Sequence, residues 1–344
     1  MSDAGAALGE RLRARDLSAA PAALNLLEST AASDREQAAA LLRELSPAAL
    51  GGEAPGHIIG LTGPPGAGKS TLLSALLHAW RGAGAGADGQ RRTVAVLAVD
   101  PSSRQSGGSL LGDRARIEFD PADRGVLIRS SAAGERLGGL AWATRTAAQA
   151  LAAAFDVVVI ETVGVGQAET EIADVADTVA VIVQPGGGDV LQFLKSGIME
   201  IPDVLVVTKA DLGEIALRSR RDLAAALRSL GSRRTPVIAV SSLPPASGIG
   251  DLVAALDEHR ADIDVAARRL RSRRAGALSD FSSEHGERGL RALGGRRAAL
   301  ALLADQDEGL GAPELLAALE RRLWQSSPSD PETGTGPLAG GGGA

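Results

Sequence analysis

Residues 63–70 are Gly-Pro-Pro-Gly-Ala-Gly-Lys-Ser, a spacing typical of loops that bind phosphate groups. Glycines in such a loop allow successive backbone N–H groups to turn inward around a phosphate. Lys69 can then contact the β- and γ-phosphates of a nucleotide, and the hydroxyl of Ser70 can bind magnesium. The sequence therefore predicts a site for a nucleoside triphosphate. The predicted contact residues are Gly63, Pro64, Pro65, Gly66, Ala67, Gly68, Lys69, Ser70 and Thr71.

A phosphate site of this kind needs carboxylates that hold Mg²⁺ and position the attacking water. Asp100 and Glu161 each follow an apolar run that predicts a buried strand, so both are expected at the same crevice as the loop. Gly164 is expected to offer its N–H to the γ-phosphate. For either carboxylate alone, a turn-capping role is the alternative, and the spacing around Asp113 by itself indicates a surface residue.

Residues 208–211 are Thr-Lys-Ala-Asp, which resembles the guanine-binding motif Asn-Lys-x-Asp. The Asp211 carboxylate can accept hydrogen bonds from the ring N–H and the exocyclic amine of guanine, whereas adenine has no matching donor pair. That mismatch is expected to cost about 2–3 kcal/mol of binding free energy. The stem of Lys209 can lie against the base, and Thr208 keeps a hydroxyl but lacks the amide that would link the motif to the phosphate loop. The alternative interpretation is a Lys-Asp pair at the start of a helix.

A weaker signal follows the last predicted strand. The backbone N–H groups of residues 241–243 are expected to contact the edge of the base. The residues concerned are Ser241, Ser242 and Leu243.

Seven short runs rich in valine and isoleucine recur along the middle of the chain, which is the pattern of strands buried on both faces. The stretches between them, such as residues 71–80 and 139–154, are long enough to be crossover helices. The prediction is an α/β fold, a mostly parallel sheet with helices on both faces, in which ligands bind at the carboxyl ends of the strands. The runs are residues 58–62, 93–99, 126–129, 157–161, 179–183, 204–208 and 237–241.

The pattern divides the chain into four regions. Residues 1–52 predict an N-terminal helical extension, 53–256 the nucleotide-binding domain, 257–325 a C-terminal helical region, and 326–344 a disordered tail. Five arginines between residues 268 and 274 fit either a basic docking surface or a solvated helix face, and nearby aspartates favour the solvated face.

Composition excludes several classes of protein. There are no cysteines and only four histidines among 344 residues, which argues against disulfides, thiol nucleophiles and cysteine-ligated metals. Aromatic residues make up 2% and the net charge is −6, so nothing indicates nucleic-acid binding. We see no signal peptide and no apolar run long enough to span a membrane, and we expect a cytoplasmic protein.

Three segments taken together resemble a known family. Residues 100–114, 161–167 and 185–198 are similar to three motifs of the methylmalonyl-CoA mutase-associated GTPases of the MeaB/ArgK type. The resemblance covers about residues 24–250 and implies a P-loop GTPase of the SIMIBI class. It also implies a homodimer that binds GTP or GDP with Mg²⁺ and protects or loads an adenosylcobalamin-dependent acyl-CoA mutase.

The resemblance also implies residue roles that spacing alone does not. It makes Asp113 a third magnesium carboxylate beside Asp100 and Glu161. It makes Lys195 a residue that enters the active site when the mutase is bound, so that Lys69, Glu161 and Lys195 form the predicted catalytic set. No arginine finger stands out in these motifs, and we therefore expect slow intrinsic hydrolysis.

Three other functions are compatible with parts of the sequence. A metal-insertion GTPase of the same superfamily is disfavoured because the chain lacks cysteines and a histidine-rich tract. A P-loop kinase acting on a transport protein or small molecule would need an acceptor pocket that the sequence does not reveal. A non-hydrolysing, nucleotide-gated interaction module would show no multiple turnover.

Overall fold

The protein is described by a computed structural model that covers residues 3–82, 91–100, 117–132, 142–162, 171–186, 202–229 and 234–326. Its centre is a seven-stranded sheet in the order β3-β2-β4-β1-β5-β6-β7, with every neighbouring pair parallel. Each of the seven predicted runs forms a strand, so the predicted fold class is confirmed. The strands are β1 (His57–Thr62), β2 (Val94–Asp100), β3 (Val126–Ala132), β4 (Val157–Thr162), β5 (Thr178–Val183), β6 (Val204–Val207) and β7 (Val237–Ala239).

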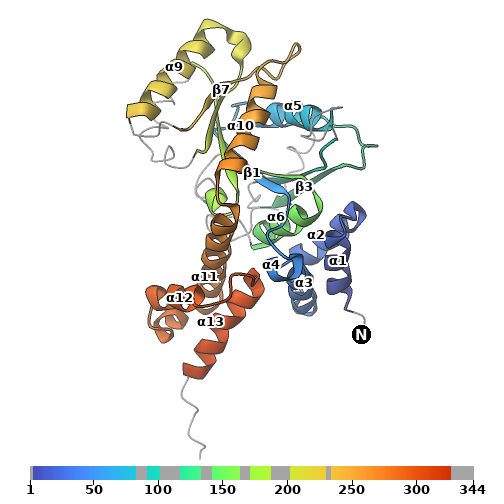
Figure 1. Cartoon of the computed structure of the whole chain (residues 1–344), viewed down its shortest axis with the longest axis vertical. Coiled ribbons are helices and arrows are strands. Elements are labelled where there is room, and N and C mark those ends of the chain that lie inside the picture. The colour runs from blue at the N-terminus through green and yellow to red at the C-terminus, as the bar shows by residue number, and fades with distance from the viewer. Residues whose placement is uncertain are drawn as a thin grey trace, which may run out of the picture.

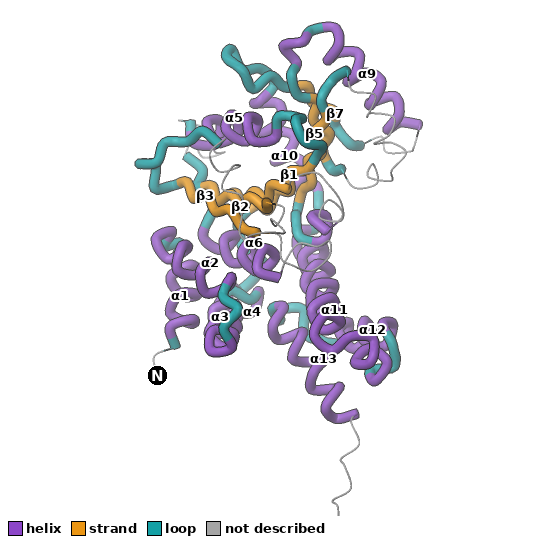
Figure 2. Tube along the Cα trace, turned by 180° about the vertical axis from the view of Figure 1, so that it is seen from behind, coloured by secondary structure: helices purple, strands orange, loops and turns teal. Residues whose placement is uncertain are grey.

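Strand β1 is the central strand and shows why the sheet is buried on both sides. Ile58 belongs to one hydrophobic core and the next residue, Ile59, belongs to another, because successive side chains point to opposite faces. Helices α5 (Lys69–Arg81) and α10 (Ile249–Asp262) cover one face, and α6 (Trp142–Ala154) and α9 (Glu214–Ser229) contribute to the other core. Figure 2 shows α5 and α6 on opposite sides of the strands.

Four short helices precede the sheet and pack beneath it. Leucines at helical spacing, such as Leu24 and Leu27, are almost fully buried in the core that also contains α6. The helices lie within the region predicted to be helical, and the boundary at residue 52 stays a prediction. They are α1 (Ala4–Arg13), α2 (Ala20–Glu28), α3 (Ala32–Glu44) and α4 (Pro47–Leu50).

The C-terminal helices form a separate unit with its own apolar core. Phe281 on α11 is fully buried there, together with Leu303 on α12 and Leu315 on α13. Figure 1 shows α11 leading away from the sheet, with α12 and α13 packed against its far end. The helices are α11 (Val265–Ala292), α12 (Arg296–Ala304) and α13 (Ala312–Ser326).

The arginines of α11 correct a prediction. The sequence favoured a solvated helix face, but only 6% of Arg269 and 5% of Arg273 is exposed. Arg273 donates to both carboxylate oxygens of Glu53, and Arg269 pairs with Asp177 at the start of β5. Charge spacing could not predict this, because the acidic partners lie about 90 and 220 residues away in sequence. These arginines therefore attach the C-terminal helices to the base of the sheet.

No helix in the ranges that the structure covers is long and apolar enough to cross a membrane.

Candidate nucleotide-binding site

The predicted phosphate loop joins the carboxyl end of β1 to the start of α5. Gly68 caps α5 with a φ of 90°, a left-handed conformation that glycine adopts without strain. Gly63 has a φ of 147°, and a Cβ atom there would lie 2.1 Å from the carbonyl oxygen of Ile182 on β5. Both positions therefore require glycine. The N-terminus of α5 opens at the loop, where the N–H groups of the first turn and the positive dipole end favour a phosphate.

Lys69 lies in the first turn of α5 with only 8% of its surface exposed. Its ammonium nitrogen donates to the carbonyl oxygens of Gly63 at 2.7 Å and Pro64 at 3.2 Å. The loop therefore already directs this charge toward the concave side of its own backbone. An ammonium group held there can stabilise the β- and γ-phosphates of a bound nucleotide.

Ser70 in the first turn of α5 and Glu161 at the end of β4 come together beside the loop. The Ser70 hydroxyl donates to Oε1 of Glu161 at 3.1 Å, and Glu161 is 5% exposed. The two residues supply a hydroxyl and a carboxylate oxygen, which are ligand types that Mg²⁺ accepts, so the donor set fits this ion.

Asp100 ends β2 at the same edge of the sheet. In the register of β2 against β4, Ala98 is opposite Glu161 and Val99 is opposite Thr162, which places the backbone of Asp100 one residue beyond that pair. The backbone of Asp100 therefore lies at the same carboxyl edge of the sheet as Glu161, and its role as a magnesium ligand stays a prediction. Asp113, Gly164 and Lys195 lie outside the described residues, and their roles stay predictions.

A pocket of about 320 Å³ opens beside the loop. It is bounded by the loop and the first turn of α5 on one side and by the carboxyl ends of β2 and β4 on the other. Thr71, which the sequence assigns to the nucleotide contacts, lines it with Lys69, Ser70 and Glu161. The pocket lies where the position of the loop predicts a triphosphate.

Thr208 links the base motif to the phosphate loop, a connection that the sequence alone did not establish. Its hydroxyl lies 2.6 Å from the carbonyl oxygen of Ala67 and 3.2 Å from that of Val183, so the single proton can be donated to either. Thr208 is 3% exposed and Ala67 is fully buried. The threonine therefore connects the base motif to the phosphate loop without an amide.

Lys209 and Asp211 complete the base motif just beyond β6. Lys209 has a φ of 55°, and its ammonium group donates to the carbonyl oxygen of Gly66 at 3.2 Å and to Oε1 of Gln184 at 2.7 Å. Asp211 accepts a hydrogen bond from the Ser241 hydroxyl at 3.0 Å. The lysine stem thus lies along the loop, and the serine orients the carboxylate that is predicted to bind guanine.

The predicted backbone contact of Ser241 with the base stays a prediction, and its N–H has a partner within the protein. Its N–H donates to the carbonyl oxygen of Ser247 at 3.0 Å, and Ser247 returns the bond to the Ser241 carbonyl. This small antiparallel bridge occupies the N–H, and Ser241 contributes its side chain instead. The contacts predicted for Ser242 and Leu243 stay predictions.

Gln184 is a residue that the sequence analysis missed. It follows the last valine of β5 at the carboxyl edge of the sheet, and its amide oxygen holds Lys209. Its position directly after an apolar run is the signal that could have identified it, since side chains at strand ends face the ligand crevice.

Comparison with known proteins agrees with this geometry. The family described as "Methylmalonyl Co-A mutase-associated GTPase MeaB" matches residues 20–285, which is most of the chain. The chain belongs to the MeaB family. As a member of this family it is a GTPase, and guanine-nucleotide binding follows from that membership.

Two relatives show the range of the MeaB family. A protein of Mycobacterium tuberculosis named "Probable GTPase" is 41% identical over 262 residues, which is 74% of each chain. The mouse protein named "Methylmalonic aciduria type A homolog, mitochondrial" is 41% identical over 195 residues, covering 54% of this chain and 44% of its own length.

A solved structure shares the fold. The crystal structure named "LAO/AO transport system kinase" superposes with a TM-score of 0.62 at 24% identity, covering 94% of this chain and 99% of that one. At this identity the likeness supports the architecture alone.

Proposed function

We propose that this chain is a GTP-hydrolysing chaperone that protects or loads an adenosylcobalamin-dependent acyl-CoA mutase of the methylmalonyl-CoA mutase type. The observation that carries the proposal is the match of residues 20–285 to a family of GTPases described by their association with that mutase. The nucleotide half of the proposal is supported by the link from Thr208 to Ala67, which joins the base motif to the phosphate loop in one rigid unit.

The residues at the loop have distinct roles in hydrolysis. Lys69 neutralises charge on the β- and γ-phosphates as the bond to the leaving diphosphate breaks. Ser70 and Glu161, with Asp100 and Asp113, would hold Mg²⁺, which when bound adds further positive charge at the phosphates. Gly164 would contact the γ-phosphate through its N–H, so that the region after β4 senses whether GTP or GDP is present.

We expect the partner to regulate the rate of hydrolysis because the sequence motifs of the site lack one catalytic positive charge. The recognised motifs contain no arginine finger, and such a group is worth about 10³–10⁵ in rate. We expect slow hydrolysis by the chain alone and faster hydrolysis when a mutase docks and brings Lys195 to the site. We assign homodimerisation to the C-terminal helical region, residues 257–325, which has its own core.

Hydrolysis measured with and without an adenosylcobalamin-dependent acyl-CoA mutase from the same organism tests the proposal. We expect multiple turnover of GTP alone and a higher rate with the mutase, while a Lys69→Ala variant loses activity under both conditions. An unchanged rate across a titration of the mutase would contradict the partner assignment. Labelled γ-phosphate recovered on an acceptor, instead of free in solution, would favour a kinase.

A second measurement separates chaperone function from hydrolysis. The mutase is incubated under turnover with the wild-type chain, with the Lys69→Ala variant, or alone, and its residual activity is followed over time. We expect the wild-type chain to slow inactivation and the variant to protect less. Equal decay in all three samples would overturn the protective role even if GTP hydrolysis is normal.

A further inference from the structure

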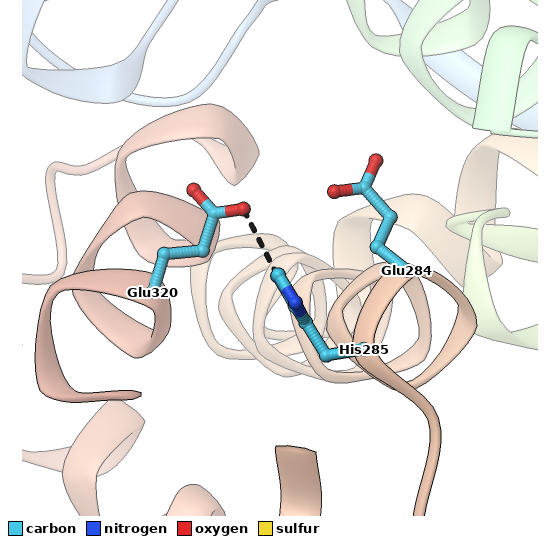
Figure 3. Close-up of side chains that lie close together, drawn as sticks. All are labelled: Glu284, His285 and Glu320. Atoms are coloured by element: carbon cyan, nitrogen blue, oxygen red, sulfur yellow. Dashed lines mark hydrogen bonds and ion pairs between the residues drawn. The ribbon is translucent and has the colours of Figure 1, made fainter. Parts of the chain in front are cut away.

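Three potential metal ligands gather in the C-terminal helices. Glu284 and His285 lie on α11 and Glu320 lies on α13, and one ligand atom from each residue lies within 4.8 Å of the other two. Figure 3 shows the imidazole of His285 between the two glutamates, with both carboxylates on the same side of the helix pair. A glutamate oxygen and a histidine nitrogen are ligands that borderline divalent cations accept together.

The histidine ring is held in place by packing. The centroid of the His285 ring is 4.7 Å from that of Phe281, and Trp324 meets the ring edge-on at 6.5 Å. Only seven residues of the whole chain are aromatic, four Phe and three Trp, so two of them beside one histidine is a marked concentration. A fixed ring loses little conformational entropy when it binds an ion, which is how surrounding residues strengthen a metal site.

The backbone around His285 also departs from a regular helix. Gly286 has a φ of 60° and a ψ of −169°, which interrupts α11 directly after His285. A Cβ atom on Gly289 would lie 2.4 Å from the Cβ of His285, so the chain beyond the break returns close to the histidine only because residue 289 is glycine. The carboxyl end of the first helical segment thus lies at the cluster, and its negative dipole end favours a cation.

The two carboxylates of the cluster have no lysine or arginine partner among the described residues. Within the part of the chain that the structure describes, neither Glu284 nor Glu320 pairs with a lysine or arginine, and the one recorded partner of Glu320 is Nε2 of His285 at 3.2 Å. Two carboxylates and a helix end therefore place negative charge around a single imidazole. A bound divalent cation would balance that charge.

We propose that Glu284, His285 and Glu320 form a binding site for a divalent transition-metal ion, with Zn²⁺ as the best match. One imidazole and two carboxylate oxygens suit Zn²⁺, whereas Mg²⁺ and Ca²⁺ prefer oxygen ligands alone. Ligand atoms around a tetrahedral Zn²⁺ lie about 3.3 Å apart. Small rotations of the glutamate side chains close the remaining distance from the 4.8 Å spread.

The position of the cluster gives the ion a structural role. Glu320 comes from α13 and the other two ligands from α11, so an ion there joins the two helices beside the core that they share. Figure 1 places these helices at the far end of the molecule from α5 and the phosphate loop. The site is therefore separate from the predicted magnesium site, and the two prefer different ions.

Calorimetric titration of the full-length, chelator-treated protein with Zn²⁺ tests the proposal, with excess Mg²⁺ and GDP present to fill the nucleotide site. We expect one Zn²⁺ per chain. Glu284→Gln and Glu320→Gln should each weaken binding at least about tenfold, because even a residue that only supports a ligand is worth that much. Glu287→Gln, which removes the same charge from an exposed position on α11, is the matched control and should bind like the wild type.

Thermal unfolding with and without Zn²⁺ provides a second readout. An ion that binds only the folded state raises the unfolding temperature of the wild type and of the Glu287→Gln variant, and the rise should be lost in the Glu320→Gln variant. Circular dichroism of the variants without metal shows whether they fold. Absence of stoichiometric Zn²⁺ binding, or equal affinity in all folded variants, would overturn the proposal and leave His285 and Glu320 as a simple hydrogen-bonded pair.

Discussion

The guanidinium group of Arg269 on α11 meets the carboxylate of Asp177 beneath the sheet, donating to Oδ1 at 2.8 Å and to Oδ2 at 2.6 Å. Asp177 is fully buried, and it also accepts hydrogen bonds from the backbone N–H of Ile58 and from Arg260. Burial raises the pKa of this carboxyl group, but the hydrogen bonds and charge of Arg269, the N–H of Ile58 and the charge of Arg260 together hold the pKa below its ordinary value. This pair secures the C-terminal helices to β1 and β5.

Loss of that carboxylate should destabilise the protein strongly. We expect Asp177→Asn to lower the free energy of unfolding by about 3 kcal/mol or more, because it leaves Arg269 as a buried charge whose remaining carboxylate partner, Glu53, lies 4.0 Å away. Chemical denaturation measures the change. The exposed pair of Arg221 and Glu214 gives the control, since Arg221→Gln should cost less than about 1 kcal/mol. Similar losses from both variants would contradict the role assigned to Asp177.

The Thr208 hydroxyl should matter for nucleotide affinity. Thr208→Val keeps the shape but removes the donor to Ala67, a bond worth about 0.5–1.5 kcal/mol. We therefore expect GDP to bind about threefold to tenfold more weakly, as measured by displacement of a fluorescent nucleotide. Thr235→Val removes a similar bond, which runs from Thr235 before β7 to the carbonyl oxygen of Pro202 before β6, and should leave affinity unchanged. A Thr208→Val variant with wild-type affinity would show that the link is dispensable.

Asp211 should determine the choice of base. We expect the wild-type chain to prefer GDP over ADP by about tenfold to a hundredfold, and Asp211→Ala to remove most of this preference. The variant lacks the carboxylate that accepts hydrogen bonds from the ring N–H and the exocyclic amine of guanine. Parallel titrations of GDP and ADP measure the ratio. Asp222→Ala on α9, which removes an exposed carboxylate from the same region, should keep the wild-type ratio. Retained selectivity in the Asp211 variant would place base recognition elsewhere.

His57 should make stability depend on pH. Burial, with a smaller contribution from the positive charge of Arg260, lowers the pKa of His57 to about 3 from an ordinary value of 6.5. Above pH 6.5 the ring is neutral in both the folded and the unfolded chain. As the pH falls below 6.5, the unfolded chain takes up a proton that the folded chain excludes, so stability decreases by about 1.4 kcal/mol per pH unit.

Denaturation curves between pH 6.5 and pH 5 test this dependence against a His57→Gln variant. Glutamine can keep a hydrogen bond to the Thr178 hydroxyl, which lies 2.7 Å from Nε2 of His57, but it does not titrate. The slope of unfolding free energy against pH should be shallower in the variant by about 1.4 kcal/mol per pH unit, which is the contribution of one proton. Parallel slopes would show that His57 protonates freely in the folded protein.

The sequence was most informative for features that a single short segment encodes, such as a strand or the phosphate loop. Runs such as residues 157–161 predict buried parallel strands because every position is apolar until the polar residue at the end, and the structure places Glu161 at the carboxyl end of β4. The Gly-rich loop needs only backbone freedom and one lysine, both of which are encoded in eight consecutive residues. Strand identity, fold class and the phosphate site could therefore be predicted from short segments.

Interactions between distant segments were decided only by the tertiary structure. Thr208 and Ala67 are 141 residues apart, and Arg269 and Asp177 are 92 apart, so no local sequence pattern identifies either pair. The backbone bond that occupies the Ser241 N–H depends in the same way on how the loop to Ser247 closes. Hydrogen bonds and ion pairs form where folding brings donor and acceptor within about 3 Å. Residue type limits which partners are possible, and the packing of sheet and helices selects among them.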